Sequence, residues 1–200
     1  MSAAAMKTSS ADELYAQLEA LPENLTGEII NGRVYAQPRP TGPHALVSSS
    51  LDGELYNPYR KGRGGPGGWW ILVEPEVHFI RDTEVLVPDL AGWRRQRMPR
   101  LPRDHRFEVA PDWVCEILSP STAKTDRVVK MPVYARHGVP YLWLVDPFVH
   151  TLEAFALRDG RWTVIGLFQE RDRVTVEPFA EIALELGGLW AETQEEDSAE

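Results

Sequence analysis

The hydrophobic positions along the chain change period several times, and each change marks an expected element. Between residues 43 and 57 the apolar side chains recur at near-helical spacing, which predicts an amphipathic helix. A shorter helix is expected to begin after Ser10, because Ser10 and Glu13 form a capping-box pattern, and to end near Pro22. The N-terminal third of the chain therefore contributes two helices.

The most apolar segments, Asp112 to Leu118 and Tyr141 to Asp146, predict strands that are buried on both faces. A helix is expected between them, from Pro120 to about His137, with a disturbance at Pro132 because proline lacks the backbone N–H. A strand, a crossover helix and a second strand form a βαβ unit, in which the two strands run parallel.

Residues 69–80 and 85–93 are rich in β-branched and aromatic side chains, and each run predicts one strand. Asn31-Gly32 separates two short extended runs, which is typical of a hairpin with a type I′ turn. The expected class is α/β, with a mixed β-sheet flanked by helices. It ends in an antiparallel meander over residues 151–157, 162–168 and 174–176.

Two hundred residues, 43% hydrophobic and 26% charged, fit one globular domain. We place that domain at residues 10–190, after a flexible N-terminus of residues 1–9 and before an acidic, disordered tail of residues 191–200. Neither a secretion signal nor an apolar run of about 20 residues is found, so no membrane association is expected. A single cysteine, Cys115, fits a cytoplasmic protein, with Cys115 as a core residue rather than a nucleophile.

The net charge of −9 argues against a general nucleic-acid coat protein, which would be basic. The charge is uneven, however, since the segment between Trp93 and Arg106 holds six arginines and one aspartate. A phosphate backbone responds to charge within a Debye length of about 8–10 Å, so a local basic segment can still bind it. The candidate phosphate-binding residues are Arg94, Arg95, Arg97, Arg100, Arg103 and Arg106.

Two acids occupy informative positions. Asp89 follows Pro88 at the end of one expected strand, and Glu116 interrupts the most apolar strand. Burial of a carboxylate costs several kcal/mol unless it is paired or bound to a cation. Mg²⁺ supplies such a cation, since it takes one or two carboxylates together with water and phosphate oxygens. The alternative is that Glu116 lies at the exposed end of its strand and caps the next helix.

Asp126, Lys130 and Tyr134 are spaced i, i+4, i+8 and share one face of the helix that follows Glu116. An acid and a lysine at this spacing commonly form a surface salt bridge. Beside a carboxylate–metal cluster, Lys130 would instead orient an attacking water or stabilise charge that develops on a phosphate. The sequence pattern leaves both interpretations open.

The chain resembles the Uma family of putative restriction endonucleases, a branch of the PD-(D/E)XK nuclease superfamily, over roughly residues 10–180. The resemblance rests on ordered motifs: Gly27-Glu28-Ile29-Ile30-Asn31-Gly32-Arg33, Val87-Pro88-Asp89, Trp113 to Thr122, Asp126, Lys130, Tyr134, Gly138-Val139 and Tyr141 to Pro147. It implies a restriction-endonuclease-like fold, with Asp89 and Glu116 as the two metal ligands. Leu118 stands where the superfamily has its lysine, and Lys130 on the following helix is the candidate replacement.

Glu76 and Glu28 are both candidates for a third acid of the site, with ordinary edge-strand acids as the alternative. His44 begins the helix at residues 43–57 and is expected either to face the site or to cap the helix. Trp93 and the pair Trp69-Trp70 are expected mostly in the core, with base stacking as the less favoured alternative.

Three functions are compatible with these residues. The first is a DNA endonuclease dependent on Mg²⁺ (or Mn²⁺), with Asp89, Glu116 and Lys130 as its catalytic residues and Asp126, Tyr134, Glu28 and His44 in support. The second is a catalytically silent module that binds nucleic acid or a protein, which Leu118 and the acidic balance favour. The third is a phosphodiesterase for small molecules. A homodimer is left open.

Overall fold

The structure, a computed structural model, describes residues 11–190. The N-terminal segment of residues 1–9, the capping residue Ser10 and the acidic tail of residues 191–200 lie outside the described residues. In the described part of the chain, no helix is long and apolar enough to cross a bilayer.

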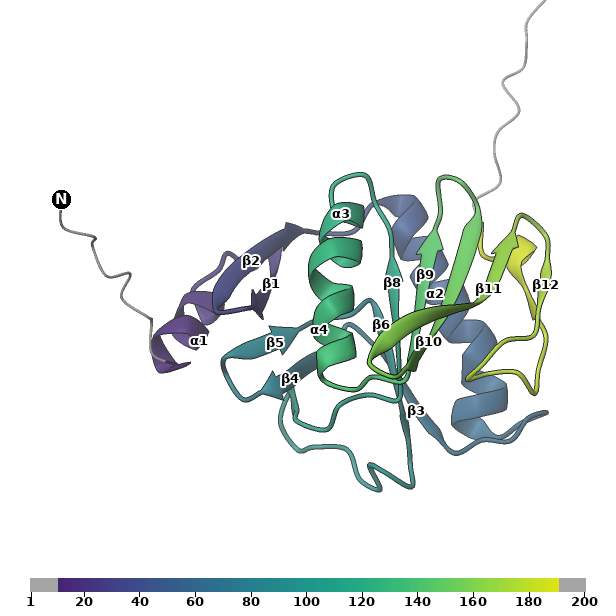
Figure 1. Ribbon diagram of the computed structural model, residues 1–200, viewed down its shortest axis with the longest axis horizontal. Helices are drawn as coiled ribbons and strands as arrows, with labels where there is room; N and C mark the ends of the chain where they lie inside the picture. The colour runs from purple at the N-terminus through teal and green to yellow at the C-terminus, as the bar shows by residue number, and fades with distance from the viewer. Residues whose placement is uncertain (1–10, 191–200) are drawn as a thin grey trace, which may run out of the picture.

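Six strands form the main sheet, in the order β11-β10-β9-β8-β6-β3. Only β8 and β9 run parallel, and every other neighbouring pair is antiparallel, so the sheet is mixed as expected (Figure 1). The strands are β3 (Trp69–Val73), β6 (Leu90–Arg94), β8 (Trp113–Ile117), β9 (Tyr141–Asp146), β10 (Thr151–Arg158) and β11 (Arg161–Gln169).

A second sheet has five strands in the order β2-β1-β5-β4-β7. Its hairpin of β1 and β2 turns at Asn31 and Gly32, whose positive φ angles of 51° and 72° confirm the type I′ turn. The short helix α1 (Ala11–Glu19) packs against this hairpin. The strands are β1 (Leu25–Ile30), β2 (Arg33–Pro38), β4 (Glu76–Ile80), β5 (Glu84–Leu86) and β7 (Arg106–Phe107).

Two expected strands are each divided between the two sheets. Residues 69–80 form β3 in one sheet and β4 in the other, and residues 85–93 are divided in the same way between β5 and β6. Pro75 and Pro88 stand at the two divisions, where proline cannot donate a ladder hydrogen bond. The prediction of single strands was wrong for this reason, and the division leaves Asp89 at the point where the chain enters the main sheet.

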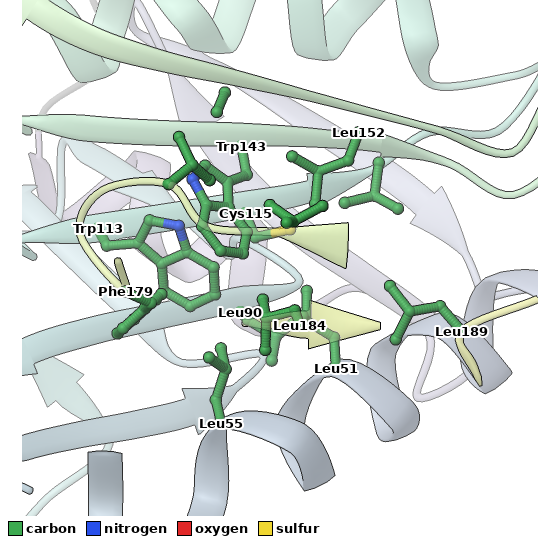
Figure 2. Packing of buried hydrophobic residues seen from close by; sticks show 14 of the residues in the cluster. Leu51, Leu55, Leu90, Trp113, Cys115, Trp143, Leu152, Phe179, Leu184 and Leu189 are labelled. Carbon is green, nitrogen blue, oxygen red and sulfur yellow. The ribbon is translucent and has the colours of Figure 1, made fainter. Parts of the chain in front are cut away.

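Helices cover both faces of the main sheet. On one face lies α2 (Gly42–Leu55), which continues as a π-helical turn, η1 (Tyr56–Lys61), and buries Val47, Leu51 and Leu55. Figure 2 shows Leu51 and Leu55 beneath the indole of Trp113 and the side chain of Leu90. Val133 and Tyr134 of the crossover helix pack on the opposite face.

The crossover helix is continuous through its proline. It consists of α3 (Ala123–Thr125), a π-helical turn, η2 (Asp126–Lys130), and α4 (Met131–Arg136). The N–H of Met131 donates to the carbonyl of Asp126, five residues back, so the turn before Pro132 is wide. A wide turn accommodates the proline ring and its missing N–H without breaking the helix.

The C-terminal meander is only partly as expected. β10 and β11 form a hairpin, but β12 (Arg173–Val174) pairs with β13 (Leu184–Glu185) in a separate two-stranded sheet, followed by the short helix η3 (Leu186–Gly188). Phe179, between these two strands, is fully buried within 5.5 Å of the rings of Trp113 and Trp143 (Figure 2). Burial of Phe179 therefore packs this C-terminal segment against the face of the main sheet that α2 also covers, instead of adding it to the sheet as another strand.

Gly92 of β6 tests this packing. A Cβ at Gly92 would lie 3.2 Å from Trp113 and 3.3 Å from Trp69, between two rings that have little room to move. Gly92→Val should lower the free energy of unfolding by about 1–3 kcal/mol in urea titrations. Gly53→Ala, where nothing lies within 4 Å of the new Cβ, should leave stability unchanged or slightly raised. Equal effects of the two substitutions would contradict the account.

Candidate functional site

A polar pocket opens where the two sheets meet, at the start of α2 and beside η2. Carboxylates outnumber permanent cations among its lining residues by five to two. The carboxylates are Glu28, Glu74, Asp89, Glu116 and Asp126, and the cations are Arg39 and Lys130. The pocket therefore carries an excess of negative charge.

Glu116 of β8 lies on the face of the sheet that the crossover helix covers, and it is only 2% exposed. The Tyr134 hydroxyl donates to Glu116 Oε1, and Lys130 Nζ lies 3.3 Å from Oε2. Burial raises the pKa of Glu116 well above its usual range, although the charge of Lys130 opposes the shift. Glu116 is therefore a buried, partnered acid and not an exposed helix cap.

Lys130 is the centre of the carboxylate cluster. Its Nζ lies 3.0 Å from Glu28 Oε1, 3.3 Å from Glu116 Oε2 and 3.5 Å from Asp126 Oδ1. Burial by itself lowers the pKa of Lys130, but the surrounding carboxylates raise it well above its usual value. Lys130 and Asp126 thus form a buried ion pair rather than a surface salt bridge.

Asp89 joins the cluster from the start of β6. Because Leu90 pairs with Cys115 in the antiparallel ladder, the same register places Asp89 opposite Glu116. Asp89 Oδ2 accepts a hydrogen bond of 2.6 Å from the N–H of Ile117. The division of the strand at Pro88 leaves the Asp89 carboxylate free to make this contact.

His44, in the first turn of α2, holds the other oxygen of Asp89. His44 Nε2 lies 3.1 Å from Asp89 Oδ1, and the buried Nδ1 has no hydrogen-bond partner among the described residues. Burial lowers the pKa of His44, but the hydrogen bond to Asp89 and the charges of Asp89, Glu74 and Asp126 raise it overall. His44 therefore faces the pocket and does not cap its helix.

Of the two candidate third acids, the structure brings Glu28 into the pocket. Glu28 Oε1 accepts a hydrogen bond of 2.9 Å from the N–H of Val87, and Oε2 accepts one of 2.8 Å from Gln37 Nε2. Together with Lys130, these contacts fix Glu28 of β1 next to the Glu116 strand.

Glu76 is not brought together with Asp89 and Glu116. It belongs to β4 in the other sheet, where Oε1 lies 2.7 Å from the Tyr15 hydroxyl, 2.7 Å from His78 Nε2 and 3.6 Å from His105 Nε2. The crossing at Pro75 is the physical reason, because it separates Glu76 from β3. Glu74, on the near side of that crossing, lines the pocket in its place.

Glu74 and Arg39 are the charged pocket residues that sequence reasoning missed. Glu74 has a φ of 47°, in the left-handed region, and its N–H donates to the carbonyl of Asp89. The sequence feature that could have identified Glu74 is Pro75, because this proline marks the point where the chain crosses from one sheet to the other. Arg39 lies in the connection between β2 and α2, where no motif pointed to it.

The arginine segment lies at the other end of β6 from Asp89. A strand of five residues spans about 17 Å, so Arg94 is remote from the pocket that Asp89 lines. Several of the guanidinium groups are also used internally. Arg95 donates to the carbonyls of Trp69 and Arg60, Arg97 pairs with Asp112 at 2.8 Å, and Arg106 pairs with Asp82 at 3.2 Å.

The tryptophans considered for base stacking belong to the core. Trp93 and Trp69 are 0% and 3% exposed, and the half-buried Trp70 lies under the Arg95 guanidinium at 3.8 Å. Cys115 is likewise fully buried, and burial raises the pKa of its thiol well above the usual range. The expectation of a core cysteine is confirmed.

A family model described as "Uma2: Putative restriction endonuclease" matches residues 12–187 of the chain. The chain belongs to this family. Among solved structures it is similar to a protein from Anabaena variabilis ATCC 29413 described as a putative nuclease belonging to DUF820, with a TM-score of 0.72 and 25% identity. That match covers 90% of this chain and 97% of the other. No curated protein matches the chain.

Asp89 and Glu116 are the two carboxylates that could hold a hard divalent cation. Within residues 11–190, no three His, Cys, Asp or Glu side chains already converge as a complete metal cage. Mg²⁺ does not need one, since it commonly keeps several waters and takes one or two carboxylates from the protein. Two neighbouring carboxylates in a pocket with excess negative charge meet that requirement.

Removal of the central ammonium tests the cluster. Lys130→Met leaves three buried carboxylates without a cation, so it should lower the free energy of unfolding by about 3–5 kcal/mol at pH 8. Lys124→Met, an exposed lysine on the same crossover helix, should change it by less than about 0.5 kcal/mol. Urea denaturation measures both, and equal stability of the two variants would refute the central role of Lys130.

The raised pKa of Asp126 determines whether stability rises or falls with pH. Burial raises its pKa to about 6, with Lys130 and Thr122 opposing and Asp89 and Glu28 adding to the shift. The folded protein thus keeps this proton at a higher pH than the unfolded chain. Its contribution to stability is present below about pH 4 and is lost as the pH rises through about 6, a change of about 3 kcal/mol.

Denaturation between pH 4 and 6 should therefore show a flatter decline for Asp126→Asn than for the wild type. Asp104→Asn, at an exposed aspartate, is the matched control and should retain the wild-type slope. Parallel slopes for wild type and Asp126→Asn would show that Asp126 does not titrate in this range.

Proposed function

We propose that the pocket hydrolyses phosphodiester bonds in DNA with Mg²⁺ or Mn²⁺. The observation that carries the proposal is the pair Asp89 and Glu116, side by side among carboxylates that outnumber cations by five to two. A phosphodiester is itself an anion, so it can approach this pocket only when a divalent cation neutralises part of the charge. Membership of a restriction-endonuclease-like family supports the choice of nucleic acid as substrate.

Asp89 and Glu116 would hold the cation. When bound, the cation supplies a water of lowered pKa and a Lewis acid for the phosphate oxygens. His44 and the N–H of Ile117 each fix one oxygen of Asp89, so the carboxylate presents a defined orientation. Tyr134 and Lys130 do the same for Glu116.

Lys130 replaces a lysine that would otherwise stand at position 118, where Leu118 is buried in the core. The crossover helix brings the Lys130 ammonium to the same acid from the next element of the chain. In this role Lys130 keeps Glu28, Glu116 and Asp126 close together despite their repulsion. It also places a positive charge beside the site where the phosphate would gain negative charge.

Cleavage of a supercoiled plasmid in Mg²⁺ or Mn²⁺ tests the proposal. The wild type should nick or linearise the plasmid, and chelation by EDTA should stop the reaction. Glu116→Gln should lose at least about 100-fold in rate, because it weakens cation binding. Glu54→Gln, at an exposed acid in the last turn of α2, should retain the wild-type rate. Equal rates for the two variants would exclude Glu116 from catalysis.

Arg39 is the exposed permanent cation among the lining residues, and it fits contact with the substrate phosphate. Arg39→Ala should raise KM for DNA by about tenfold, corresponding to about 1.4 kcal/mol, with a smaller change in kcat. Arg33→Ala, at an exposed arginine at the start of the preceding strand β2, should leave both parameters unchanged. Steady-state kinetics at fixed salt would separate the two, and a KM unaffected by Arg39→Ala would remove Arg39 from the substrate site.

A catalytically silent module is the second candidate, and one observation favours it. Lys130 Nζ already lies within 3.5 Å of three carboxylates, so the cluster contains a cation of its own without a metal. On that account the wild type would bind nucleic acid or a protein yet leave the plasmid intact in either metal. The cleavage assay therefore decides between the two candidates.

A further inference from the structure

Two segments of the chain concentrate positive charge at the end of the molecule away from the pocket. Residues 56–68 form η1 and the glycine-rich loop, and residues 94–103 follow from the end of β6. Together they contain eight cations and no acid, in a chain whose net charge is −9. The cations are Arg60, Lys61, Arg63, Arg94, Arg95, Arg97, Arg100 and Arg103.

Hydrogen bonds join the two segments into one surface, which we call the basic end. The N–H of Arg95 donates to the carbonyl of Gly68 at 2.8 Å, and Arg95 Nη2 donates to the carbonyl of Arg60 at 2.9 Å. Trp70 Nε1 donates to the carbonyl of Met98 at 3.0 Å. Residues far apart in the sequence therefore present their charges together.

Most of these charges face solvent. Lys61, Arg63, Arg94, Arg100 and Arg103 are exposed. Nearby carboxylates offset some of them. Asp112 pairs with Arg97, the charge of Arg60 acts on the half-buried Asp52, and Arg100 lines a hollow together with Asp104 and Glu108. The basic end thus keeps an excess of positive charge.

The basic end is separate from the pocket. The helix α2 runs from His44, at the pocket, to η1, at the basic end, and its 14 residues span about 21 Å. In Figure 1, α2 descends from beside α3 at the top of the molecule to the lower right. A phosphodiester bound at Asp89 cannot touch the basic end, so the two regions bind different phosphates.

We propose that the basic end binds the phosphate backbone of nucleic acid as an anchoring surface distinct from the pocket. Guanidinium groups match phosphate oxygens in bidentate geometry. The guanidinium of the exposed Arg94 lies 4.6 Å over the ring of Trp69, which limits the freedom that this side chain loses on binding. The proposal relies on the proposed function only in choosing nucleic acid as the polyanion.

Binding without metal tests the anchoring surface apart from cleavage. A fluorescent 20-base-pair duplex is titrated with protein in EDTA, and anisotropy gives the binding constant at several salt concentrations. The test variant combines Arg63→Glu, Arg100→Glu and Arg103→Glu, since none of these side chains forms a hydrogen bond or salt bridge with another residue of the described range. The control combines Arg33→Glu, Arg158→Glu and Arg161→Glu, which are exposed arginines on two other hairpins and change the net charge equally.

The wild type should bind the duplex in EDTA, with affinity that falls steeply as salt rises. The test variant should lose at least about tenfold in affinity and flatten the logarithmic salt dependence by about three units, one for each lost phosphate contact. The control variant should bind more tightly than the test variant and keep the wild-type slope.

Three results would overturn the proposal: no binding by the wild type at low salt, equal losses in the two triple variants, or binding to vesicles of anionic lipid without binding to the duplex. Equal losses would show that total charge, and not this surface, governs the interaction. Absence of plasmid cleavage together with intact, surface-dependent duplex binding would instead refute the proposed catalysis alone.

Discussion

The buried ammonium of Lys130 is the interaction on which the arrangement of the site depends. It contacts one carboxylate from β1, one from β8 and one from its own helix, so a single charge ties three elements together. Without it, three acids would repel one another in a poorly hydrated space. Removal of one partner of a buried ion pair is strongly destabilising for this reason. Asp89 and Glu116 can line the same pocket because Lys130 offsets part of the repulsion among its acids.

Much of the fold could be predicted because its signals are local. The hairpin at Asn31-Gly32, the helix over residues 43–57 and the buried strands around Cys115 and Trp143 each follow from the periodicity of a short segment. The division of two strands between sheets did not follow, since runs of β-branched residues look alike whichever sheet they join. Pro75 and Pro88 were the sequence features that marked the two divisions. The position of Phe179 depends on contacts with distant strands, which no local pattern encodes.

Part of the candidate site could also be predicted from the sequence. An acid in the apolar strand around Glu116 and a lysine on the face of the next helix pointed to each other, and the structure brings them together. Glu28 and Glu76 could not be separated from the sequence, because their places depend on which sheet each strand joins. The arginine segment was predicted to bind phosphates from its charge alone, and that stays a prediction. The charge of a segment does not show where that segment lies relative to the acids. The structure puts the arginine segment at the end of β6 that is far from Asp89.

The account as a whole rests on divalent-cation binding by Asp89 and Glu116, and thermal unfolding in EDTA and in millimolar Mg²⁺ or Mn²⁺ measures it directly. A cation that binds only the folded protein should stabilise the wild type by about 1–3 kcal/mol, a rise of several degrees in Tm. Asp89→Asn and Glu116→Gln should show no rise, while Glu54→Gln should respond as the wild type does. If Glu116→Gln and the wild type respond identically to metal, Glu116 is not a ligand and the account is contradicted.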